Sequence, residues 1–140
     1  MFSALDISTS ALAAQRIRMT AIAGNIANIS TTHNELGEPE PYKPRYVVFQ
    51  ADASVGSHGA KGVKVAAVRV EADRPPRYKY EPGHPDAIQS GPMKGYVAYP
   101  DINMMTEMTD ALEAARAYEA NLGAIEITKD LTQQTLRILA

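Results

Sequence analysis

The sequence has no cysteine and no tryptophan, and it has only two phenylalanines. The absence of cysteine excludes disulfide bridges and thiolate chemistry, so the fold must hold without covalent cross-links. The scarcity of large aromatic side chains argues against a large aromatic core. No apolar run reaches the length of a membrane-spanning helix, so direct insertion into a membrane is not expected.

A strong charge of either sign is also missing. The formal net charge is -2, which gives no long-range attraction to nucleic acid, and we expect no nucleic-acid partner. The charge is uneven, however. Residues 101–140 carry seven acidic and three basic residues, whereas residues 1–32 carry one acidic and two basic residues. We therefore expect the two ends of the chain to attract each other mildly.

The first thirty residues do not have the features of a cleavable secretory signal. They lack a basic start, and Gln15, Arg16 and Arg18 interrupt the apolar positions. If the protein leaves the cytoplasm, we expect it to use a route that does not read such a signal.

Motifs for enzyme chemistry are missing as well. The three histidines, His33, His58 and His84, lie in loop-like surroundings, and none has a metal-ligand spacing. The stretch 56–59 is predicted to be a turn between two strands. The glycine-rich stretch 56–62 contains a lysine but lacks the spacing of a phosphate-binding loop, so it is also interpreted as a turn. A hydrolytic pair of His84 and Asp86 would rest only on their closeness in the chain. The sequence therefore predicts no catalytic residue, no metal site and no cofactor.

A long helical pattern occupies the C-terminal end. Residues 101–140 contain no proline and one glycine, and Asp101 or Asn103 can cap the first turn of a single long helix. Apolar or small residues recur there in steps of four and three, as in a coiled-coil seam. They are Met104, Met108, Ala111, Ala115, Tyr118, Leu122 and Ile125.

A second helical pattern extends from residue 3 to about residue 30. Its apolar positions with heptad spacing are Leu5, Leu12, Met19, Ile22 and Ile26. Asn25 and Asn28 lie three residues apart, hence on one face of the helix. They are either solvated amides near the helix end or interface amides that fix the register by bonding to a partner. The spacing does not decide between these alternatives.

The composition changes abruptly between the helices, because all nine prolines and six of the seven tyrosines lie between His33 and Pro100. Four strands are predicted: residues 45–51, 62–72, around 78–80, and 96–99. The second strand slips phase at Ala66 and Ala67, which predicts a β-bulge. Residues 38–44 and 81–91 are too rich in proline and glycine to be regular, so we expect loops or extended arms.

These patterns predict an α+β fold in which long terminal helices form a coiled-coil-like pair with a small β-rich segment inserted between them. We expect residues 1–32 and 101–140 to form one coiled-coil domain and residues 33–100 to form a β and loop segment. The helices have more apolar seam than one helix pair can cover, which favours assembly.

Several stretches, in this order along the chain, resemble bacterial flagellar rod and hook proteins. They are NIANIST (25–31), PYKPRYVVFQ (41–50), GVKV (62–65), YEPGHPDA (80–87), GYVAYPDIN (95–103) and EMTDALEAARAYEANL (107–122). The likeness runs through nearly the whole chain. The sequence is thus identified as a member of the flagellar axial proteins, and it is most similar to a basal-body rod subunit of the proximal rod.

This resemblance implies a structural subunit of the basal-body rod and no enzyme. It implies polymerisation through the terminal helices with itself, other rod proteins and hook-basal-body components, to transmit torque and line the export channel. It also implies delivery to the periplasmic rod by the flagellar type III export apparatus without a cleaved signal peptide. The predicted subunit-interface residues are Leu5, Leu12, Met19, Ile22, Asn25, Ile26, Asn28, Met104, Met108, Ala111, Ala115, Tyr118, Leu122 and Ile125.

A second class of function is a soluble coiled-coil adaptor that displays a small β module to bind a peptide. Met104, Met105 and Met108 could line an adaptable peptide groove, although packing in a core or interface is the more common use of methionine at helical spacing.

Overall fold

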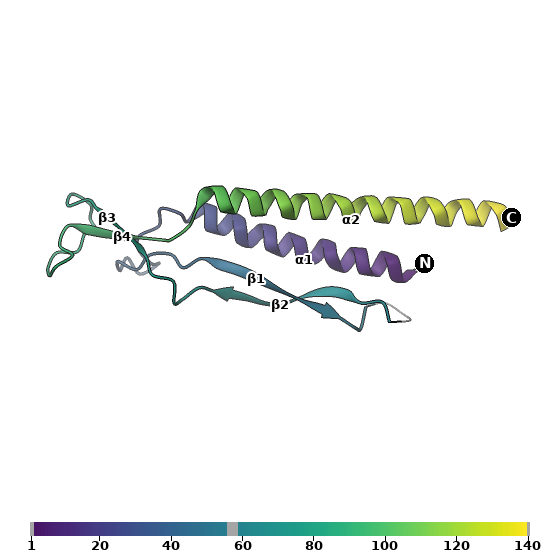
Figure 1. Cartoon of the computed structure of the whole chain (residues 1–140), viewed down its shortest axis with the longest axis horizontal. Helices are drawn as coiled ribbons and strands as arrows, with labels where there is room; N and C mark the ends of the chain where they lie inside the picture. Colours follow the sequence, from purple (N-terminus) through teal and green to yellow (C-terminus); the bar gives the residue numbers. More distant parts are fainter. Residues whose placement is uncertain (1, 56–58, 140) are drawn as a thin grey trace.

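The computed structural model describes residues 2–55 and 59–139. The elements in chain order are α1 (Phe2–Ala27), β1 (Arg45–Asp52), β2 (Gly62–Val70), β3 (Arg77–Tyr80), β4 (Tyr96–Tyr99) and α2 (Met104–Leu139). The molecule is elongated: the β1–β2 hairpin lies along α1, and the β3–β4 hairpin projects from one end (Figure 1). The predicted α+β fold with long terminal helices and inserted strands is confirmed.

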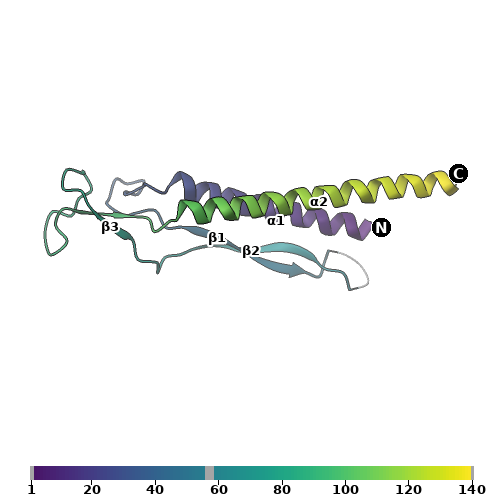
Figure 2. The same cartoon turned by 45° about the horizontal axis from the view of Figure 1, so that its top comes forward.

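The central element is α1, which packs against α2 on one side and against the β1–β2 hairpin on the other. The two helices are antiparallel, and Figure 2 shows α2 passing in front of α1 with the hairpin below both. α2 has 36 residues and α1 has 26, so α2 extends beyond α1 at the end where the two termini lie. Neither helix, within the described residues, is long and apolar enough to span a membrane.

Side-chain amides define the inner ends of both helices. The Oδ1 atom of Asn103 accepts hydrogen bonds from the backbone N–H groups of Met105 (3.0 Å) and Thr106 (3.4 Å), so the predicted cap of α2 is Asn103. Asp101 instead accepts a bond from Arg74. α1 ends at Ala27, about three residues before the predicted end, and the Asn28 side chain donates to the carbonyl of Gly24 (2.9 Å) in its last turn.

The strands form two separate antiparallel pairs, β1–β2 and β3–β4. Val48 faces Ala67 and Phe49 faces Val65, so Ala66 has no partner across the hairpin and the predicted bulge is confirmed. The proline-rich segments 38–44 and 81–91 contain no regular structure, as predicted. The turn predicted over residues 56–59 includes residues 56–58, which lie outside the described part of the chain.

Most of the buried side chains fall into two small groups. One lies at the β3–β4 end and comprises Ala87, Val97, Pro100 and Ile102. The other lies in the helical part and comprises Ala14, Ile22, Asn25 and Ala114. Most large aliphatic residues of α2 are exposed, and this exposure defines the candidate site.

Candidate assembly interface

The contact between the two helices uses one line of residues on α2, which we call the inner line. Its members are buried or half-buried: Glu107, Ala111, Ala114, Tyr118, Asn121 and Ile125. Arg18 of α1 reaches across to Glu113 (3.2 Å) and Asp110 (3.6 Å). The attraction expected between the basic N-terminal and acidic C-terminal segments is therefore present as an ion pair between α1 and α2.

Asn25 joins three segments of the chain. Its side-chain nitrogen donates to the Arg45 carbonyl (2.8 Å) and to the Glu107 carboxylate (3.2 Å). Its side-chain oxygen accepts from the Arg45 N–H (2.9 Å) and from the Tyr42 hydroxyl (3.2 Å). Both donors and both acceptor positions of the amide are used, and the side chain is 3% exposed. This amide fixes α1, the start of β1 and the start of α2 against each other.

The two asparagines of α1 therefore have different surroundings. Asn25 is buried and bonded within its own chain, whereas half-buried Asn28 closes the end of the helix and accepts a bond from the Thr31 hydroxyl (3.1 Å). One of the two alternatives was that these amides fix the register of a contact. Asn25 does fix a register, but between elements of its own chain. Whether either residue also contacts a neighbouring subunit remains a prediction.

The seam predicted on α2 and the inner line share Ala111, Tyr118 and Ile125 but differ at every other position. The remaining predicted residues, Met104, Met108, Ala115 and Leu122, lie one position further around the helix, and we call this set the α2 flank. Met104, Met108 and Leu122 are exposed, Leu122 by 43%, and Ala115 is half-buried. The packing of α1 on the inner line thus leaves an apolar flank uncovered.

The structure also shows why α1 packs on the less apolar of the two lines. Ala114, which is fully buried, permits close approach of the helices, and Glu107 supplies the acceptor for Asn25. Hydrophobicity alone favours the line with Met108 and Leu122, so the sequence did not reveal Glu107, Ala114 and Asn121 as contact residues. The sequence feature that could have indicated the inner line is Glu107, a polar residue at a heptad position that can accept a hydrogen bond from Asn25.

The other predicted residues of α1 lie at intermediate depth. Ile22 is buried, and the half-buried members are Leu5, Leu12, Met19, Ile26 and Asn28. Each of these half-buried residues retains accessible surface along a helix that is already packed on two sides. Their predicted roles in subunit contacts remain predictions.

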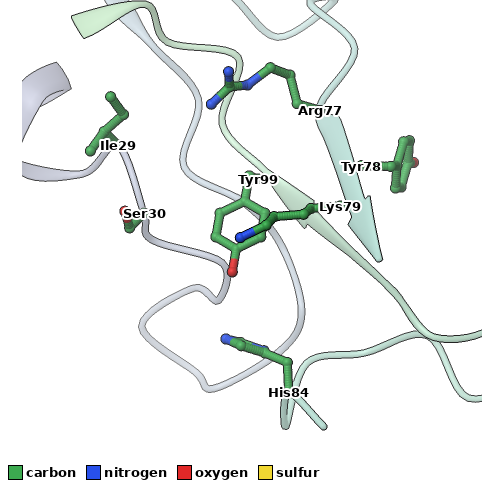
Figure 3. A pocket seen from close by; sticks show the side chains of 7 residues that line it. All are labelled: Ile29, Ser30, Arg77, Tyr78, Lys79, His84 and Tyr99. Carbon is green, nitrogen blue, oxygen red and sulfur yellow. The ribbon is translucent and has the colours of Figure 1, made fainter. Parts of the chain in front are cut away.

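A cleft of about 660 Å³ separates the β3–β4 hairpin from the segment that follows α1 (Figure 3). It is lined by Ile29, Ser30, Arg77, Tyr78, Lys79, His84 and Tyr99. The Tyr99 hydroxyl donates to Glu81 (2.7 Å), which raises the pKa of Tyr99. The hydrogen bonds to Glu81 from Lys79 and then from Tyr99 lower the pKa of that carboxyl.

His84 and Asp86 do not form a hydrolytic pair. The Nδ1 atom of His84 accepts the backbone N–H of Asp86 (3.1 Å), and the Asp86 carboxylate lies 3.9 Å from that atom, beyond hydrogen-bond distance. That carboxylate accepts the Thr32 hydroxyl, which is the main reason that the pKa of Asp86 is lowered; nearby His33 adds to the effect. Among the described residues no three His, Asp or Glu side chains gather as metal ligands.

Two families of known proteins match the parts of the chain that contain α1 and α2. Residues 5–33 match the family "flagella basal body rod protein", and residues 93–138 match the family "flagellar basal body rod FlgEFG protein C-terminal". The chain is 38% identical to the flagellar basal-body rod protein FlgC of Borreliella burgdorferi, with 99% of this chain and 97% of the relative covered. It is 37% identical to the FlgC of Salmonella typhimurium (99% and 97% covered) and 34% identical to that of Bacillus subtilis (98% and 97% covered).

Proposed function

Because the chain belongs to the FlgC family of flagellar basal-body rod proteins, we propose that its α2 flank packs against helices of neighbouring rod subunits. The protein is a structural component of the basal-body rod and not an enzyme. It assembles with other rod and basal-body components, and a peptide-binding adaptor has no support from this family.

The observation that carries this proposal is the exposure of Met104, Met108 and Leu122 on a helix whose inner line is already filled. Burying one such side chain contributes about 1.5–3 kcal/mol. Ala111, Tyr118 and Ile125 of the inner line border the α2 flank, so α2 can hold α1 on one side and a neighbouring helix on the next. A helix with apolar residues on two adjacent sides is typical of a packed bundle.

The test is the variant Leu122→Asp in cells that have no other copy of the gene. We expect loss of the protein from isolated basal bodies and loss of motility, because the contact would bury an unpaired carboxylate. The purified variant should keep the circular dichroism of the wild type, since Leu122 lies outside the inner line.

Two variants control for this substitution. Leu122→Met keeps the volume and polarity of the site and should assemble normally. Glu126→Lys changes the charge at an exposed position one turn after Leu122, where the native residue is already charged, and should have a mild effect. Normal basal bodies in Leu122→Asp cells would remove the α2 flank from the assembly surface.

We also propose that the flagellar type III apparatus exports the chain to the periplasmic part of the rod with no cleaved signal. There it would help to transmit torque and to surround the export channel. Support comes from α1, since a cut near residue 25 or 30 would remove Ile22 and Asn25 from the helix pair. Intact-mass measurement on protein from basal bodies should show that α1 is retained, and a species that begins near residue 25 or 30 would contradict the proposal.

A further inference from the structure

Both helices carry small or apolar residues on faces that are used neither by the α1–α2 contact nor by the α2 flank. On α1 the exposed positions in steps of four and three are Thr9, Ala13, Arg16, Thr20, Ala23 and Ala27, which we call the α1 outer face. On α2 a line with similar steps comprises Ala117, Ala120, Ala124, Ile127, Leu131, Gln134 and Ile138, which we call the α2 outer face.

Neither outer face has the composition of a solvated helix surface. Such a surface is normally rich in charged residues. α1 has three charged residues in 26, and of these only Arg16 lies on the α1 outer face. On the α2 outer face Ile127 is 63%, Leu131 is 54% and Ile138 is 84% exposed. Both faces therefore have the composition of a surface that another helix covers.

Charge complements this composition. Arg16 is exposed and forms no ion pair with any described residue. The line of the α2 outer face continues seven residues before Ala120 to Glu113, whose side chain remains 68% exposed although it bonds to Arg18. One face thus offers an unpaired cation and the other an accessible carboxylate.

The axial positions of these two charges also agree. Within the chain Arg18 lies level with Asp110 and Glu113, and Arg16 is two residues away, or about 3 Å along the helix axis. A second copy with the same orientation, placed side by side at a similar level, would therefore bring its Glu113 next to Arg16.

We propose that the two outer faces are the complementary halves of one contact between copies of this chain. The α1 outer face of one copy packs on the α2 outer face of the next, and Arg16 of one pairs with Glu113 of the other. Such a contact is heterologous, so its repetition generates a ring or a helical array rather than a closed dimer. The inference rests on the proposed role as a rod subunit but uses residues distinct from the α2 flank.

The absence of native cysteine permits a direct test by disulfide trapping. A chain with Ala13→Cys and a differently tagged chain with Ala117→Cys are produced together in cells lacking the wild-type gene, and basal bodies are oxidised after isolation. Ala120→Cys and Ala124→Cys, used in place of Ala117→Cys, cover a shift of one or two helical turns. We expect a mixed disulfide between the two tagged chains with at least one of the three partners, and no dimer from either chain alone.

Two results would overturn the inference while leaving the proposed function intact. One is incorporation of both chains without a mixed disulfide for any partner. The other is a disulfide between two Ala13→Cys chains, which would indicate a symmetric contact. Absence of the protein from basal bodies of wild-type cells would instead contradict the proposed function itself, and this inference with it.

A charge exchange tests the pairing of Arg16 with Glu113. Arg16→Glu and Glu113→Arg should each lower the amount of protein in basal bodies, by about threefold to fivefold for a partly exposed pair, and the double variant should restore at least half of the loss. Glu113→Arg also removes the ion pair with Arg18 in the same chain, so the control for folding is the melting temperature of purified Arg16→Glu, which should be unchanged. A double variant no better than the single variants would exclude the pairing.

Discussion

The β3–β4 end and the helix pair bury their side chains in different ways. At the β3–β4 end Val97 and Pro100 are fully buried and Ala87 and Ile102 are nearly so, and we call these four residues the closed core. The helix pair buries two alanines, Ile22 and the amide of Asn25, and leaves Leu112, Leu122, Leu131 and Ile138 exposed. The first region buries this core within one chain, although Tyr78 and Tyr80 of β3 remain exposed. The second leaves its large apolar residues exposed, and these are the residues that we propose a neighbouring subunit covers.

The largest loss of stability is expected for Asn25→Asp, because Asn25 holds the helix pair together by hydrogen bonds rather than by apolar packing. The aspartate would lose both bonds that the amide donates and would face the Glu107 carboxylate and the Arg45 carbonyl. We expect the free energy of unfolding to fall by about 2–4 kcal/mol in urea titrations followed by circular dichroism.

Asn28→Asp is the matched control, because Asn28 bonds only to its own helix end and to Thr31. Its cost should be about 1 kcal/mol or less. Equal costs at the two positions would show that the three-segment junction at Asn25 does not dominate the stability of the helix pair.

A pair of alanine variants compares the closed core directly with the exposed helix surface. Val97→Ala removes two methyl groups from a fully buried side chain, so the isolated chain should lose about 1–2 kcal/mol of unfolding free energy. Leu131→Ala should change it by about 0.5 kcal/mol or less, because Leu131 is largely exposed. A cost at Leu131 as large as that at Val97 would mean that the α2 outer face belongs to the fold of the single chain.

The elements of the fold were accessible from the sequence because their signals are local. The steps of four and three in residues 104–125, the proline boundary at Pro100 and the phase slip at Ala66 each act within a few residues. The helix, its cap and the bulge therefore followed from the sequence, with errors of about three residues at the inner helix ends.

The interface was harder to derive because two heptad lines on α2 share Ala111, Tyr118 and Ile125. Hydrophobicity ranks the line with Met108 and Leu122 above the line with Ala114 and Asn121, yet α1 takes the second. That choice depends on the close approach at Ala114 and on bonds from Asn25 to Arg45 and Glu107, which are distant in sequence. Spacing within one helix contains no information about such long-range partners.

Amide hydrogen exchange on the dilute monomer should show a smaller difference between the β segment and the helix pair. We expect the strands of the β segment to exchange more slowly than the terminal helices, because the apolar surfaces of the helices lack partners outside an assembly. The C-terminal part of α2, which extends beyond α1, should open most readily, by about 1 kcal/mol relative to residues 111–125. Slow, uniform exchange along both helices would contradict an open helix pair.

The smallest effect is expected from Thr32→Val, which tests whether the β3–β4 end also depends on a charge. Thr32 is buried and donates its hydroxyl to Asp86, the main cause of the lowered pKa of that carboxyl. A pKa that is lower in the folded than in the unfolded state means that ionised Asp86 stabilises the fold above about pH 4, and that this contribution disappears as the pH falls through the lowered pKa. Valine has nearly the same shape but no hydroxyl, so the variant should be less stable than the wild type at pH 7.

The pH dependence distinguishes this charge effect from a packing defect. The difference in melting temperature between Thr32→Val and the wild type should shrink between pH 4 and pH 2, as Asp86 becomes protonated in both proteins. Thr20→Val is the control, because the Thr20 hydroxyl bonds to the Arg16 carbonyl on an exposed helix face and has no carboxylate partner. If the melting temperature of Thr32→Val is lowered as much at pH 2 as at pH 7, the hydroxyl contributes through packing. The stability of the closed core that includes Val97 then does not depend on the charge of Asp86.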